Sequence, residues 1–160
     1  MAQNRTTAGS FSTDELLAFL RQDELDYPAA ALKFGKDSLS FLKELVESSD
    51  ENLATKAAYL VGYIEGEEAD KILEGAASTG PAPVRVAAAF GAQKRNSPVA
   101  EKILQRSLED NDPSVVKFAL LSVKVKKLEK NLKSKIDRIS KNFMDDTIKM
   151  AAGEMLRKIN

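Results

Sequence analysis

Apolar residues recur at helical spacing along most of the chain, and no segment alternates apolar and polar residues for long enough to predict a strand. A clear example is the run formed by Leu128, Leu132, Ile136 and Ile139. The pattern therefore predicts an all-α protein with ten helices. We place these helices over residues 13–22, 25–34, 37–48, 51–64, 67–77, 82–94, 97–109, 113–124, 127–141 and 145–159.

Four of the apolar stretches follow one frame. They are LATKAAYLV from Leu53, VRVAAAFGA from Val84, VVKFALLSV from Val115 and IKMAAGEML from Ile148, with starts 31, 31 and 33 residues apart. The first position is always aliphatic. The fifth position is always alanine, at Ala57, Ala88, Ala119 and Ala152. A fixed period of this size indicates stacked supersecondary units.

Each unit reads as two helices joined by a turn that suits a helix start. The turns place Asp50, Pro81, Asp112 and Asp145 shortly before the second helices. Aspartate can cap a helix N-terminus, and proline is tolerated in the first turn because its missing N–H would be unpaired there anyway. We therefore expect an α-solenoid of about five antiparallel helix pairs, with a period of about 31–33 residues.

The ends of the chain depart from this frame. Residues 1–10 are polar, and we expect them to form a disordered N-terminal tail. Residues 11–160 are expected to form a single repeat domain. Its first helix pair is atypical, because its second helix contains Pro28 and should begin at or just before that residue.

The repeated frame resembles a HEAT repeat. The resemblance covers residues 37–159, and its short period is similar to the bacterial HEAT-like repeats of phycobilin lyases. It implies a curved α-solenoid whose second helices line a concave, protein-binding side. The residues that carry it are Val84-Arg85-Val86-Ala87-Ala88 and Asp110, Asp112, Pro113, Val115, Ala119 and Val123.

The recurring arginine of that family is kept at Arg85 and, conservatively, at Lys149, while Ala54 and Val116 replace it elsewhere. The matching turn aspartate survives as Asp110. We therefore expect the hydrogen bond between repeats that this family uses only between Arg85 and Asp110.

The amino-acid composition excludes most kinds of catalytic site and metal site. The chain has no histidine, cysteine or tryptophan. Histidine-based acid–base catalysis, thiol nucleophiles and His or Cys metal sites are thereby excluded. The acidic stretch of residues 65–70 and the pair Asp145–Asp146 flank helix starts, where they favour the helix dipole. We predict no enzymatic activity, no cofactor and no metal site.

Charge is balanced overall but unevenly distributed. Residues 1–114 carry 12 basic and 19 acidic side chains, whereas residues 115–160 carry 12 basic and 5 acidic ones. The basic stretch of residues 123–141 could contact phosphate groups, although its lysines also suit the solvated face of an amphipathic helix. We expect a monomer, or weak salt-sensitive self-association between the acidic and basic ends.

A helical wheel of the second helices places a set of side chains opposite their core positions. On the presumed concave face it puts an aromatic end and a cationic end, which together suit a peptide with apolar anchors and acidic residues. The alternative is that these residues only pack against neighbouring repeats or lie in solvent. The candidate partner-binding residues are Tyr59, Phe90, Lys117, Leu121, Lys124 and Arg157.

These features predict a non-catalytic scaffold or adaptor that binds a protein or peptide on the concave face. Two alternatives remain at this point: a nucleic-acid-binding protein that uses the basic C-terminal half, and a phycobilin lyase or chaperone-like subunit. The N-terminal stretch has no apolar signal region, and no segment is apolar enough to span a membrane. We therefore expect a cytoplasmic protein with no membrane partner.

Overall fold

The computed structural model describes residues 12–159, and every regular element among them is a helix. The chain is thus all-α, as predicted. The elements are α1 (Thr13–Leu20), α2 (Tyr27–Phe34), the 3₁₀ turn η1 (Lys36–Ser38), α3 (Leu39–Val46), α4 (Glu51–Val61), α5 (Glu67–Ala76), α6 (Ala82–Gly91), the 3₁₀ turn η2 (Ala92–Lys94), α7 (Ser97–Ser107), α8 (Pro113–Lys126), α9 (Lys133–Asn142) and α10 (Asp146–Lys158). The predicted tail of residues 1–10 lies outside the described residues.

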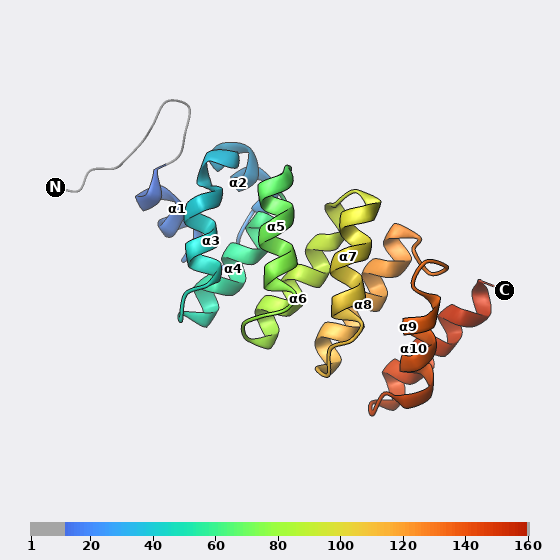
Figure 1. The fold of residues 1–160 in the computed structure, drawn as a ribbon. Helices are drawn as coiled ribbons and strands as arrows, with labels where there is room; N and C mark the ends of the chain where they lie inside the picture. The colour runs from blue at the N-terminus through green and yellow to red at the C-terminus, as the bar shows by residue number, and fades with distance from the viewer. Residues whose placement is uncertain (1–11, 160) are drawn as a thin grey trace.

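The later helices lie in two layers that follow chain order (Figure 1). Helices α3, α5, α7 and α9 form one layer, and α4, α6, α8 and α10 form the other. Each first helix packs on the second helix that follows it. Within the second layer, α4 packs on α6 and α6 packs on α8 over extensive contacts, whereas α8 and α10 touch far less.

Helix starts follow the predicted turn chemistry. Asp50, Asp112 and Asp145 are the N-caps of α4, α8 and α10, and each carboxylate accepts hydrogen bonds from backbone N–H groups of the first turn. These N–H groups have no partner inside the helix, so the caps stabilise the starts by about 1 kcal/mol each. Helix α2 begins at Tyr27, directly before Pro28, as the sequence predicts.

The repeated alanines occupy equivalent places in the core. All four are fully buried on the second helices: Ala57, Ala88, Ala119 and Ala152. Such small side chains let neighbouring helices approach closely. One close approach lies between the end of α4 and α6, where a Cβ atom added at Gly62, directly after α4, would stand 3.2 Å from the Cα atom of Gly91.

One predicted helix start was wrong. We placed a helix over residues 127–141, but α9 begins at Lys133. Helix α8 runs on to Lys126, and Lys127 then adopts a left-handed conformation with φ of 58°, which reverses the chain. Leu128 and Leu132 keep their helical spacing and are buried, but they belong to the turn that follows.

Within the described residues, none of the helices combines the length and the apolar character that crossing a membrane would require.

Candidate ligand-binding groove

A groove of about 620 Å³ lies between α8 and α10. Its size falls within the range of small-ligand and peptide pockets. Apolar side chains from both helices share it with charged groups. The lining residues are Pro113, Ser114, Lys117, Phe118, Leu120, Leu121, Lys124, Glu129, Asp145, Thr147, Ile148, Ala151, Glu154, Met155 and Lys158.

The side chain at one recurring position differs between the closely packed second helices and the pair that forms the groove. The eighth position of the repeated frame holds a buried leucine, Leu60, in α4, then Gly91 in α6, Ser122 in α8 and Met155 in α10. Glycine allows the close approach of α6 to α4. Ser122 is buried, and its hydroxyl donates a hydrogen bond of 2.8 Å to the carbonyl of Ala89 in α6. The longer Met155 side chain lines the groove from α10, and we expect it to act as a spacer between α8 and α10.

A second difference concerns the ion pair that links successive units. In α6, Arg85 reaches forward to Asp110 in the turn between α7 and α8. The equivalent position in α8 is Val116, and Phe143 stands where a matching turn aspartate would be. Neither residue can form an ion pair, so α8 lacks the corresponding link to the last helix pair.

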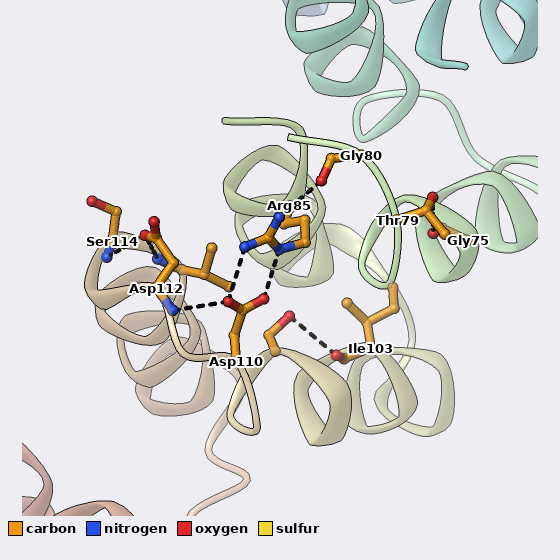
Figure 2. A network of polar contacts seen from close by, with 10 residues as sticks. Gly75, Thr79, Gly80, Arg85, Ile103, Asp110, Asp112 and Ser114 are labelled. Atoms are coloured by element: carbon orange, nitrogen blue, oxygen red, sulfur yellow. Dashed lines mark hydrogen bonds and ion pairs between the residues drawn. The ribbon is translucent and has the colours of Figure 1, made fainter. Parts of the chain in front are cut away.

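Figure 2 shows this link between Arg85 and Asp110. Arg85 donates two hydrogen bonds to the carboxylate, of 2.8 Å from Nε and 3.1 Å from Nη2, and a third of 2.8 Å from Nη1 to the carbonyl of Gly80. The backbone N–H of Asp112 also donates to Asp110, at 2.9 Å. The hydrogen bond expected between Arg85 and Asp110 is confirmed.

This network shifts the pKa of Asp110. Burial by itself raises that pKa, but the hydrogen bonds from Arg85 and from the backbone N–H of Asp112 outweigh it and hold the pKa below its usual value. The carboxylate therefore stays charged in the folded protein at neutral pH.

Of the described residues, three lysines and three carboxylates line the groove, and the wall formed by α8 carries lysines but no carboxylate. Of the carboxylates, Asp145 caps α10 and Glu154 lies 3.8 Å from Arg157. Among residues 12–159, no carboxylate lies within 4.0 Å of the lysine ammonium groups that line the groove, which belong to Lys117, Lys124 and Lys158.

The structure divides the predicted site residues into two groups. Lys117, Leu121 and Lys124 line the groove together. Arg157 does not line it and instead pairs with Glu154 on the same helix. Phe118, Met155 and Lys158 were not predicted from the sequence, because the wheel placed Met155 towards the core and assigned Phe118 and Lys158 to neither face. The sequence signal at this groove is the change from Ser122 to Met155 at the eighth position, although the same position also holds a large residue, Leu60, in α4.

Tyr59 and Phe90 lie elsewhere, in an aromatic cluster on the N-terminal half. Their ring centroids are 5.9 Å apart, and Tyr27 lies 5.9 Å from Tyr59 and stacks on Tyr63 at 5.8 Å. Burial raises the pKa of Tyr27 to about 12, and its tyrosine neighbours add to the shift. All four rings are partly buried, so this cluster fixes α2 against α4 and α6.

Arg95 is a buried charge that the sequence analysis did not single out. Its Nη2 donates a hydrogen bond of 2.8 Å to the carbonyl of Ile64, and its Nε lies 3.1 Å from a carboxylate oxygen of Asp70, without hydrogen-bond geometry. Burial lowers the pKa of Arg95, and Asp70 opposes that shift. Arg95 thus ties the start of α7 to the connection between α4 and α5.

The acidic clusters serve the helices that they begin. Glu67, Glu68 and Asp70 lie in the first turn of α5, and Asp146 lies in the first turn of α10. Across the described part of the chain, no three of the carboxylates come together in a group that could hold a metal ion.

The lining of the groove between α8 and α10 combines apolar side chains with lysine ammonium groups, an arrangement suited to binding.

No model of a known protein family matches this chain, and no curated protein matches it either.

Proposed function

We propose that this protein is a non-catalytic scaffold or adaptor, built as a HEAT-like α-solenoid, that binds a protein or peptide on the face of its second helices. The observation that carries the proposal is the groove between α8 and α10. It exposes apolar surface beside unpaired lysines, the combination found where an interface combines apolar anchors with charged contacts.

Two features support the HEAT-like interpretation. The fifth-position alanines are fully buried in all four of the second helices that carry them. Arg85 and Asp110 form the ion pair between units that the family resemblance implies. In such stacks each unit contacts only its neighbours, which leaves one long face free for partners.

Exposed apolar side chains allow a direct test of this face. Leu121 and Met150 stand at the seventh and third positions of the repeated frame and are 47% and 68% exposed. Leu32 and Met144 are 89% and 91% exposed and belong to α2 and to the turn before α10. The double variant Leu121→Asp/Met150→Asp tests the proposed face, and Leu32→Asp/Met144→Asp is the matched control.

The measurement is quantitative affinity capture with chemical cross-linking, on variants whose thermal unfolding matches that of the wild type. We expect proteins cross-linked to the wild type and to the control variant to be lost from the Leu121→Asp/Met150→Asp variant. If every cross-linked protein is retained by that variant, or is lost equally from the control, the proposed binding face is wrong. Salt-sensitive gel shifts with duplex DNA or RNA that depend on residues 123–141 would instead favour a nucleic-acid-binding protein.

A further inference from the structure

We infer that the groove between α8 and α10 binds an acidic amphipathic helix of a partner protein, with apolar side chains facing the groove floor and two carboxylates facing Lys117 and Lys124. This inference rests on the proposed function and names the chemistry of the ligand.

The walls of the groove favour a helical ligand. Both are long helices, α8 with 14 residues and α10 with 13. A helix of 14 residues is about 21 Å long, enough to support a ligand helix of about four turns. A helix laid between two others can pack its side-chain ridges into the grooves of both, as in other helix-in-groove complexes.

The spacing of charges along α8 favours acidic residues two turns apart. Lys117 and Lys124 are seven residues apart, which places them about 10.5 Å apart along the helix axis. A ligand helix with carboxylates at positions i and i+7 has the same spacing. Leu121 lies between the two lysines and is half exposed, so apolar residues at i+3 and i+4 of the ligand would face it.

The charge of the α8 wall, which carries Lys117 and Lys124 and no carboxylate, favours this ligand over a basic or neutral one. Asp145 and Glu154 already have partners, and Glu129 is the remaining acidic side chain of the lining. The lysines on the two walls have no carboxylate partner among residues 12–159. Lys117 and Lys124 are exposed, so carboxylates of a ligand helix can approach them and add attractive contacts.

The floor supplies the apolar contacts that hold such a helix. Phe118 and Met155 are partly buried and line the groove from opposite helices. Ala151 is exposed and lines the α10 wall, so its small side chain leaves room there. Apolar side chains of a ligand can therefore remove both walls from water at the same time.

The test uses a synthetic helical peptide with glutamates at i and i+7 and leucines at i+3 and i+4, and a second peptide with both glutamates replaced by glutamine. Binding to the full-length protein is measured by fluorescence anisotropy at low and high salt. We expect the acidic peptide to bind at least about tenfold more tightly than the glutamine peptide at low salt. We also expect added salt to weaken the binding of the acidic peptide.

Two variants locate the binding site. Lys117→Glu/Lys124→Glu should abolish binding of the acidic peptide, whereas Lys71→Glu/Lys133→Glu, which reverses two exposed lysines outside the groove, should retain it. Ala151→Trp should block the groove without changing its charge. The matched control is Ser40→Trp at an exposed position on α3. Circular dichroism confirms that each variant is folded.

Several results would overturn the inference. They are absence of acidic-peptide binding, equal binding of the two peptides, and binding that survives both groove variants. Displacement of the peptide by duplex DNA would assign the lysines to nucleic acid, and self-association lost in Lys117→Glu/Lys124→Glu would assign the groove to a second copy. If these tests fail while capture still depends on Leu121 and Met150, the proposed function stands and only the ligand chemistry is wrong.

Discussion

The contacts of α8 on its two sides differ, although the two neighbouring helices follow the same repeated frame. Towards α6, Ser122 donates a hydrogen bond to the carbonyl of Ala89 and accepts one of 3.0 Å from Gln93. Towards α10 the contact is small and a groove of about 620 Å³ remains open, with Met155 on its wall. One contact contributes to the core, and the other leaves a surface free for a ligand.

The side chain at the eighth position differs between the two contacts: Ser122 is small and hydrogen-bonded to α6, whereas Met155 is long and lines the groove. Helix α10, which carries Met155, packs mainly on α9 and only lightly on α8. The exposed apolar surface between α8 and α10 then remains available for binding instead of contributing to stability.

The largest expected effect comes from placing a methionine, the residue type of Met155 in α10, at the equivalent position of α6, which is Gly91. A Cβ atom at Gly91 would lie 3.3 Å from the side chain of Leu73 and 3.5 Å from the Cα atom of Gly62. Gly91→Met must therefore push α6 away from α4 and α5, and we expect it to lower the free energy of unfolding by about 3 kcal/mol. Urea denaturation measures this change.

Gly75→Met is the matched control for that substitution. Gly75 lies in α5, and a Cβ atom there would meet nothing within 4 Å. We expect this variant to be as stable as the wild type or slightly more stable, because glycine is a poor helix former. If Gly91→Met were as stable as Gly75→Met, the eighth position would not control the approach of the second helices.

Much of the fold could be predicted from local sequence patterns that fit only one type of secondary structure. The spacing of apolar residues predicts all ten helices, and the aspartates at Asp50, Asp112 and Asp145 predict three of their starts. The start of α9 was not predictable in the same way. Leu128 and Leu132 fit a helix equally well, and the reversal at Lys127 depends on a left-handed conformation that the pattern of a lysine-rich stretch does not indicate.

The candidate site was less predictable than the fold. A helical wheel indicates which residues face away from the core, so it found Lys117, Leu121 and Lys124. It assumes that every pair of second helices packs at the same distance. Under that assumption Tyr59 and Phe90 belong to the same binding face as the lysines. The structure instead places both rings in a partly buried cluster on α4 and α6, and the groove lies between α8 and α10. Spacing between helices depends on side-chain volumes in contact, which a wheel does not include.

A smaller effect is expected from removing the ion pair between Arg85 and Asp110, which links α6 to the turn before α8. Helix α8 has no equivalent ion pair with the turn before α10. Asp110→Asn removes the charge that Arg85 binds, and we expect a loss of about 1–2 kcal/mol at pH 7. The folded pKa of Asp110 is lowered, so its contribution is fully present above the unfolded pKa of about 3.9 and is lost as the pH falls through the folded pKa. Urea denaturation from pH 7 to pH 3 should therefore show the wild type and the variant converging in acid.

Asp23→Asn serves as the control for this pH series, since Asp23 is exposed in the connection between α1 and α2. Its stability should follow the wild type throughout. A gap between wild type and Asp110→Asn that stays constant down to pH 3 would contradict the role given to the charge of Asp110.

The smallest expected effect comes from removing the spacer between α8 and α10. Met155 is only partly buried, so Met155→Ser should cost about 1 kcal/mol, less than truncation in a closed core. The chain has no cysteine, so Lys117→Cys and Ala151→Cys introduce the only two thiols, and spin labels on them report the distance across the groove. We expect Met155→Ser to shorten that distance by about 1–2 Å, towards the spacing of closely packed helices. Met150→Ser, at an exposed position of the same helix, should leave the distance unchanged, and an unchanged distance in Met155→Ser would show that the groove is held open by something other than the methionine.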